Sequence, residues 1–278
     1  MRLPTIRPMT PDDVEETAAA LLGANWGDRR LHLAFATRHP GVVPFVADAA
    51  GTVVGTGMAT INGAVGWVGT IWVHPDWRRR GLGMELTRTV TDVAEDAGCR
   101  TLLLVATQAG RPLYERIGFE VQTSYQMLEA PGLAEATVDP RMRPFRTSDL
   151  AGIDDLALAA TGEDRAHLHA AFATPESAHC LVHDDGSLGG FVVRAPWGGG
   201  STIAPRLEDA EAILHSRRAG LDPDERIRAG LPIENAKGIE RLLENGWTAL
   251  WHAPRLIRGD PLRWQPEAIW GQFNHAMG

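Results

Sequence analysis

The sequence predicts an α/β fold with a mixed sheet, present in two tandem copies. Stretches rich in β-branched residues come first and then alternate with helical patterns, an order typical of a mixed sheet. Three landmarks of the first half recur in the second half in the same order: Ile6–Val14 as Met142–Leu150, Val54–Gly55 as Leu188–Gly189, and Gly118–Phe119 as Gly246–Trp247. A repeated order of landmarks indicates two copies of one domain.

The elements of the first copy follow from its periodicity and its turn residues. In chain order we expect helix over 14–22 and on to about 37, strands over 42–48, 52–59 and 64–73, helix over 84–97, strand over 101–106, a short helix over 111–117, and a strand from Phe119. Gly98 and Gly118 stand where the two later helices should end. On a regular strand, Trp67 and Trp72 would face opposite sides of the sheet.

The domain boundaries follow from the repeat. We predict domains at 1–130 and 141–278, joined by a linker at Glu129–Pro140, whose first residues include proline and glycine. The second range ends in an aromatic tail that contains Trp264, Trp270 and Phe273. A free terminus rarely carries such residues, so we expect the tail to pack against a domain or a partner.

Composition narrows the class of protein. The 278 residues carry a formal net charge of -8, which argues against a general nucleic-acid binder. No apolar run is long enough to cross a membrane, and the first residues lack a signal-peptide core, so we expect a cytoplasmic protein. Two cysteines, Cys99 and Cys180, do not suggest a disulfide framework.

One basic, glycine-containing stretch stands out against this acidic background. Arg78–Gly83 follows a strand that ends before Pro75 and precedes the helical pattern from Met84. The first amides of a helix lack partners and carry partial positive charge, and glycines let an anion approach the main chain. The stretch therefore predicts a phosphate-binding loop. The alternative is a solvated basic turn that only caps the helix.

Two motifs in order resemble those of the GCN5-related N-acetyltransferase (GNAT) superfamily. Arg78–Gly83 fits its acetyl-CoA loop, Gln/Arg-x-x-Gly-x-Gly/Ala, and Tyr114–Phe119 fits its tyrosine shortly before Gly-Phe. The resemblance covers residues 5–128 well and residues 142–258 in layout only. It implies two tandem GNAT-like acyl-CoA N-acyltransferase domains.

The resemblance also implies the site. Acetyl-CoA would be the co-substrate, and the residues expected to bind it are Ile71, Trp72, Val73, Arg78, Arg79, Arg80, Gly81, Leu82, Gly83, Met84 and Thr107. Tyr114 would be the general acid that protonates the departing CoA thiolate, or else an ordinary half-buried helix residue. No metal is expected.

Departures from the family pattern distinguish the two copies. Thr107 stands where the family often has an asparagine, whereas the second copy has Asn235 but Leu242 in place of the tyrosine. Where the loop should be, the second copy has Ile203–Asp209, whose two acids would repel a pyrophosphate. We therefore expect a degenerate second domain and one cofactor per chain.

The function expected from the resemblance is transfer of the acetyl group to a primary amine of a small molecule, by direct attack of the amine on the thioester. A non-catalytic CoA-binding or sensing module and a protein N-acetyltransferase are the alternatives. The acceptor, the general base, a homodimeric state and a ligand of the second domain stay open.

Overall fold

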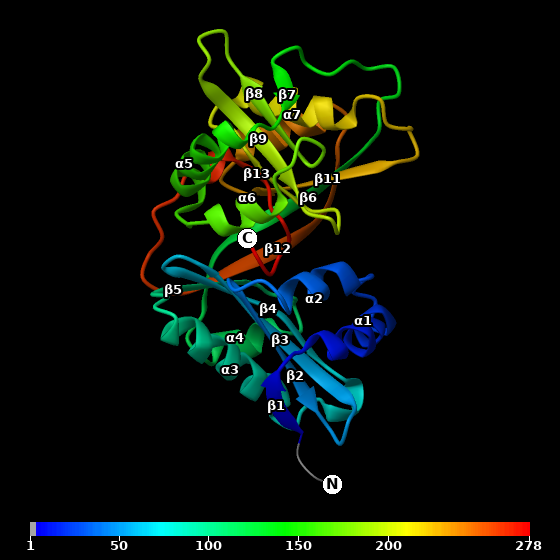
Figure 1. Cartoon of the computed structure of the whole chain (residues 1–278), viewed down its shortest axis with the longest axis vertical. Helices are drawn as coiled ribbons and strands as arrows, with labels where there is room; N and C mark the ends of the chain where they lie inside the picture. Colours follow the sequence, from blue (N-terminus) through cyan, green and yellow to red (C-terminus); the bar gives the residue numbers. More distant parts are fainter. Residues whose placement is uncertain (1–3) are drawn as a thin grey trace. The chain divides into compact units, whose positions relative to one another are not determined.

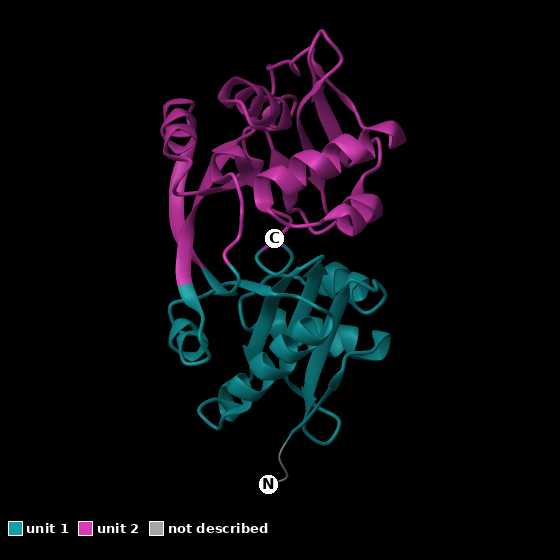
Figure 2. Cartoon of the chain, turned by 90° about the vertical axis from the view of Figure 1, so that its left-hand side faces the viewer, with its two compact units in different colours: residues 1–120, 256–260, 275–277 teal, residues 121–255, 261–274, 278 magenta. Residues whose placement is uncertain are grey.

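The computed structural model describes residues 4–278, which form two compact units (Figure 2). Of the described residues, unit 1 comprises 4–120, Leu256–Asp260 and His275–Met277, and unit 2 comprises Val121–Arg255, Pro261–Asn274 and Gly278. Each unit combines helices with strands, and the predicted α/β class with a mixed sheet is confirmed. The ranges 1–130 and 141–278 refer to the repeat in the sequence rather than to these units, and they stay a prediction.

Unit 1 is a twisted sheet with helices on both faces (Figure 1). Its strands are β1 (Thr5–Pro8), β2 (Val42–Asp48), β3 (Val53–Asn62), β4 (Val65–Val73) and β5 (Thr101–Val105), followed in the sheet by the last residues of β12 (Thr248–Gly259). Its helices are α1 (Val14–Gly23), α2 (Arg30–Ala36), α3 (Leu82–Asp96) and α4 (Arg111–Glu115), with short 3-10 turns at Pro11–Asp13 and Pro75–Trp77. The pairs from β1 to β4 are antiparallel, and β4 pairs with β5 in parallel.

Glycines in β3 let α3 lie directly on the sheet. A Cβ built on Gly55 would lie 2.8 Å from Leu86 Cδ1, and one on Gly57 would lie 2.8 Å from Val90 Cγ2. Both distances are shorter than real Cβ contacts, so larger residues would push the helix away. The helices α1 and α2 lie on the opposite face (Figure 1).

Strand β4 is not regular, and this corrects the expectation for its two tryptophans. Trp67 pairs with Thr60 and Trp72 with Thr56, and paired residues lie on the same face of a sheet. The two tryptophans therefore share a face, because β4 carries an extra residue where Thr70 has φ +54°. Both side chains are buried.

Unit 2 also combines strands and helices, but its strands belong to two different sheets. One sheet has the order β13-β10-β9-β8-β7, and in the other the first part of β12 is followed by β6 and β11. The strands are β6 (Glu120–Pro131), β7 (Met142–Pro144), β8 (Ala178–Val182), β9 (Leu188–Arg194), β10 (Gly200–Ile203), β11 (Arg226–Pro232) and β13 (Ile269–Gly271). The helices are α5 (Leu150–Thr161), α6 (Ala166–Phe172), α7 (Leu207–Arg218) and α8 (Ala236–Glu244), with 3-10 turns at Thr147–Asp149 and Pro266–Ala268.

The predicted linker, Glu129–Pro140, begins too early in the sequence, so this part of the prediction is wrong. Glu129, Ala130 and Pro131 are the last residues of β6 and pair antiparallel with the first residues of β11. Pro131 is tolerated at the end of the strand, where its missing N–H costs no interior ladder bond. The irregular connection to β7 therefore begins only after Pro131.

The same ion pair stands at the start of both copies. Arg7 Nη1 and Nη2 donate to the two oxygens of Asp13, both over 2.8 Å. Arg143 does the same to Asp149, over 2.7 and 2.8 Å. In each copy a main-chain N–H three residues before the aspartate also donates to it, at 2.7 Å. A shared geometry at matching positions supports the repeat seen in the sequence.

The aromatic tail packs as expected. Trp270 and Phe273 are fully buried, and the Arg255 guanidinium lies 4.4 Å from the ring centre of Trp264. The next residues, His275–Met277, belong to unit 1.

Candidate functional site

The predicted phosphate loop ends at the first turn of α3. Gly81 has φ +88° and is the N-cap, and Arg79 has φ +58°. The first main-chain bond of the helix runs from the Glu85 N–H to the Gly81 carbonyl, over 3.1 Å. The three amides before Glu85 therefore have no helical partner and are available to an anion. No atom lies within 4 Å of a Cβ built on Gly81, so the approach is open.

The three arginines of the loop keep their charges uncompensated. Arg78 donates from Nε to the Val73 carbonyl over 3.0 Å, and the Arg80 guanidinium lies 5.4 Å from the centre of the Trp77 ring. None of the three arginines forms an ion pair with any part of the chain that the structure describes. The loop is therefore positive as well as rich in free amides.

Beside the loop, β4 and β5 separate. Their ladder runs from Val65 opposite Thr101 to Trp67 opposite Leu103 and goes no further, although β4 continues to Val73. The later residues of β4 still pair with β3 on their other side. The edge of β4 over Ile71–Val73 is thus a strand edge that an extended ligand could pair with.

Tyr114 lies at the same corner of unit 1. A Cβ built on Gly110 would lie 3.2 Å from Thr107 Oγ1 and 3.2 Å from Tyr114 Cε2, so these three residues meet. A Cβ built on Gly83 would lie 3.3 Å from Leu113 Cδ1 and 3.6 Å from Val73 Cγ2. The structure therefore brings together the start of α3, the end of β4 and helix α4, as the order of motifs implies.

Burial controls the acidity of Tyr114. Its ring packs edge-on to Phe119, with ring centres 6.3 Å apart, and is buried. Loss of water around the phenolate raises the pKa of Tyr114 to about 12. The phenol is therefore fully protonated near neutral pH.

In unit 2, a strand of the chain fills the corresponding gap. Strand β10 does not pair with β11; it pairs antiparallel with β13, with Thr202 opposite Gly271 and Ile203 opposite Ile269. On the other side, Gln272 Nε2 donates to the Gly230 carbonyl of β11 over 3.1 Å. Residues 269–272 thus stand between β10 and β11, where the matching strands of unit 1 separate.

The asparagine that the family pattern reserves for the cofactor binds this segment instead. Asn235 Nδ2 donates to the carbonyls of Glu267, over 3.0 Å, and Ile269, over 3.4 Å. The Trp270 indole N–H donates to the Ala204 carbonyl over 3.1 Å, and a Cβ on Gly238 would lie 2.5 Å from the Trp270 ring. The segment is therefore held by hydrogen bonds and by close packing.

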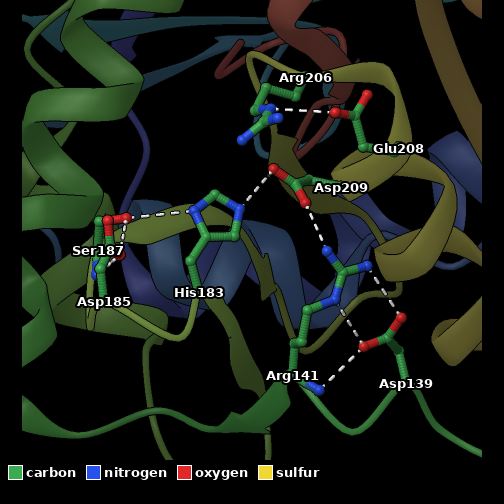
Figure 3. Close-up of polar contacts among 8 residues, drawn as sticks. All are labelled: Asp139, Arg141, His183, Asp185, Ser187, Arg206, Glu208 and Asp209. Carbon is green, nitrogen blue, oxygen red and sulfur yellow. Dashed lines mark hydrogen bonds and ion pairs between the residues drawn. The ribbon is translucent and has the colours of Figure 1, made fainter.

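The start of α7 carries a carboxylate where unit 1 has its glycine loop (Figure 3). Asp209 is buried, and its two oxygens lie 3.0 Å from Arg141 Nη1 and 2.9 Å from His183 Nε2. A Cβ built on Gly189 would lie 2.6 Å from His183 Nε2, so only glycine fits beneath this pair. A bound phosphate would face a fixed negative charge here.

Unit 1 therefore combines a glycine loop at a helix start with two parallel strands that separate beside it. Residues 12–119 match the Acetyltransferase (GNAT) family. This stretch contains both motifs that the sequence suggested, and the fold of the chain is similar to that of tandem GNAT proteins.

Individual proteins show how far the likeness extends. An uncharacterized N-acetyltransferase of Bacillus subtilis, YitH, is 29% identical over 189 residues, which are 65% of this chain and 65% of that protein. A solved structure from Pyrococcus horikoshii superposes over 100% of this chain and 97% of its own, with a TM-score of 0.82 and 19% identity. A tandem GNAT protein from the clavulanic acid biosynthesis pathway covers 93% of this chain and 99% of its own, with a TM-score of 0.61 and 15% identity. The two solved structures bear on the fold alone.

Membrane-spanning helices and metal-binding clusters can be assessed for residues 4–278. Within them no helix is long and apolar enough to cross a membrane, and no cluster of three metal-binding side chains occurs. Cys99 and Cys180 are both buried, and neither is part of a disulfide.

The sequence missed the segment that fills the gap in unit 2. Residues 269–272 have no cofactor-like signal, and only their aromatic content marked them for packing.

Proposed function

We propose that unit 1 is an acetyl-CoA-dependent N-acetyltransferase that acts on the primary amine of a small molecule. The observation that carries this proposal is the set of unpaired amides at the start of α3, which follows three uncompensated arginines and adjoins the separated strands β4 and β5. Pyrophosphate and an extended pantetheine arm are the two features of CoA that such a site fits.

The residues that would hold acetyl-CoA follow from this placement. We assign its pyrophosphate to Arg78, Arg79, Arg80, Gly81, Leu82, Gly83 and Met84, and its pantetheine arm to the main chain of Ile71, Trp72 and Val73 with Thr107 at the far side. The co-substrate supplies the acetyl group as a thioester. Backbone amides at the separated end of β4 are suited to stabilise the negative charge that develops on the thioester oxygen.

Tyr114 is proposed as the acid that assists departure of the thiolate. Its raised pKa of about 12 makes complete proton transfer to a thiolate, whose conjugate acid titrates near 8.5, unfavourable by about 5 kcal/mol. Tyr114 would therefore keep its proton and act as a hydrogen-bond donor to the sulfur while the carbon–sulfur bond breaks. CoA would leave as the thiolate, and the proton lost by the attacking amine would pass to water. This role predicts a moderate contribution to the rate.

We further propose one cofactor per chain. In unit 2 the gap that would take a pantetheine arm is filled by residues 269–272, and Asp209 stands near the start of α7. The second range, 141–278, would then be a degenerate domain that keeps the fold of an acetyltransferase without its cofactor.

The test is release of CoA thiol from acetyl-CoA in the presence of a panel of primary amines, with cofactor binding measured by calorimetry. Acceptor-dependent release together with one bound CoA per chain supports the proposal. Tight CoA binding without release for any amine would overturn it in favour of a CoA-sensing module. Release only with protein substrates would overturn the small-molecule assignment.

A further inference from the structure

Arg29 is a half-buried guanidinium without an acidic partner. Its Nε donates to the Trp26 carbonyl over 2.9 Å, and no ion pair of Arg29 occurs anywhere in residues 4–278. The nearest acids in the chain are already used, because Arg30 binds Asp28 over 3.0 Å and Glu15 over 2.9 Å. Burial lowers the pKa of Arg29, so its charge is poorly solvated.

Two histidines lie within the field of this charge. Burial, together with the positive charge of Arg29, lowers the pKa of His32 to about 3 and that of His275 to about 4. Arg29 is the N-cap residue of α2, and His32 lies buried in the first turn of that helix, close enough to feel the charge of Arg29. His275, which belongs to unit 1 although it lies near the end of the sequence, also feels the charge of Arg29. The cluster is one fixed positive charge with two neutral imidazoles.

The segment that carries His275 is fixed on the sheet of unit 1 beside the irregularity in β4. Thr60 Oγ1 donates to the Ala276 carbonyl, and Asn62 Nδ2 donates to the Met277 carbonyl, both over 3.0 Å. A Cβ built on Gly69 would lie 2.2 Å from Ala276 Cβ, so glycine is required there. With about 3.8 Å between successive Cα atoms, the main chain of His275 lies within about 8 Å of Gly69.

Position and charge together suggest a ligand. Gly69 directly precedes Thr70, the left-handed residue of β4, and both lie beyond Trp67, where the ladder between β4 and β5 ends. We propose that Arg29, with His32 and His275 beside it, binds the carboxylate of the acceptor, so that the acceptor is an amino acid or a similar amino-carboxylate. This inference rests on the proposed function of unit 1. One guanidinium matches the single charge of a carboxylate, whereas a phosphate monoester would bring nearly two charges against it.

The kinetic experiment compares carboxylates with matched amides. The acceptors are glycine, β-alanine and 4-aminobutyrate, each beside its primary amide, with thiol release from acetyl-CoA as the readout. For at least one pair we expect kcat/KM to favour the carboxylate. Arg29→Gln should raise the KM of that carboxylate about 10- to 100-fold and leave the amide and the KM of acetyl-CoA unchanged. Arg30→Gln, which removes a neighbouring paired arginine, should change neither acceptor.

The outcomes separate this inference from the proposed function. Equal use of carboxylates and amides, or an Arg29→Gln effect that is the same for both, would overturn the carboxylate site while leaving the transferase intact. Preference for phosphoethanolamine over all the amino-carboxylates would replace the carboxylate with a phosphate and would also overturn it.

A binding experiment does not need the reaction. N-acetylglycine, a product-like carboxylate, is titrated into the protein without cofactor while the imidazole signals of His32 and His275 are followed by NMR. Saturable shifts of these two signals, absent in Arg29→Gln and present in Arg30→Gln, support the site even if no amine is acetylated. Absence of saturable shifts in the unchanged protein would overturn it.

Discussion

The gap between β4 and β5 in unit 1 and the gap between β10 and β11 in unit 2 are the same feature with opposite contents. In unit 1 the ladder ends at Trp67, and a basic glycine loop adjoins the free edge of β4. In unit 2, β13 pairs along β10, and Gln272 reaches β11. The fold by itself therefore does not make a cofactor site. The two units differ in whether the hydrogen-bonding edge of the strand is left open to a ligand or is paired by another segment of the chain.

The two helix starts beside these gaps differ in the same sense. Gly81 leaves the amides of α3 open, whereas Asp209 near the start of α7 is already bound by Arg141 and His183 (Figure 3). A carboxylate in the first turn of a helix interacts favourably with its dipole, as a phosphate would. In unit 2 the protein thus supplies its own anion and its own strand.

The largest expected effect comes from loosening the segment that fills the gap in unit 2. Trp270→Ala removes an indole that is 1% exposed and whose N–H binds the Ala204 carbonyl, so the free energy of unfolding should fall by about 3–5 kcal/mol. Urea denaturation measures this change. The control is Trp251→Ala, because Trp251 is 46% exposed and should cost less than about 1 kcal/mol.

This variant also tests the comparison between the units. The loosened gap should still bind no CoA, since the main chain of β13 can still pair with β10 and Asp209 remains at the start of α7. If calorimetry found two CoA molecules per chain of Trp270→Ala, the segment alone would account for the loss of the second site.

The next effect concerns the open loop. Gly83→Asp adds a carboxylate among the free amides of α3, and its Cβ would press on Leu113 at 3.3 Å. CoA affinity should fall at least about 100-fold, measured by calorimetry on a variant whose circular dichroism is unchanged. Glu208 occupies the matching first turn of α7, and Glu208→Gln should leave CoA affinity as it is. Normal affinity in Gly83→Asp would refute the loop assignment.

The sequence predicted the open gap much better than the filled one. The anion-binding character of Arg78–Gly83 follows from its local sequence, whereas Tyr114 was singled out by the resemblance to a family motif; both roles stay predictions. The three residues of β13 have no such local signal, because their pairing depends on a chain return from far away in the sequence. The extra residue at Thr70 was missed for a related reason: threonine with φ above zero is unfavourable, and only the packed sheet imposes it.

A smaller effect is expected at the catalytic corner of unit 1. Tyr114→Phe keeps the ring that packs on Phe119 and removes the hydroxyl, so turnover should fall about tenfold while acetyl-CoA affinity stays the same. The position that matches Tyr114 in unit 2 is Leu242, which is buried and has no acid function. Steady-state kinetics with calorimetry measures both quantities. Unchanged turnover would remove Tyr114 from the mechanism.

The smallest effect tests what the two units share. Arg7 and Arg143 hold the pKa values of Asp13 and Asp149 below their usual range through paired hydrogen bonds. These carboxylates therefore contribute stability that is complete above the unfolded pKa of about 3.9 and is lost as the pH falls through their lowered folded pKa values.

The matched variants are Arg7→Gln and Arg143→Gln. Because Arg7 is 36% exposed and solvent screens its charge, each variant should lose only about 1 kcal/mol at pH 7. The difference from the unchanged protein should shrink as the pH falls below the unfolded pKa of about 3.9 and through the lowered folded pKa values of the two aspartates. Arg7 also binds Asp48 over 3.0 Å, so its variant should lose slightly more. Urea denaturation with pulsed hydrogen exchange reports β1 and β7 separately; destabilisation at only one of the two strands would show that the repeated ion pair does not have the same role in both units.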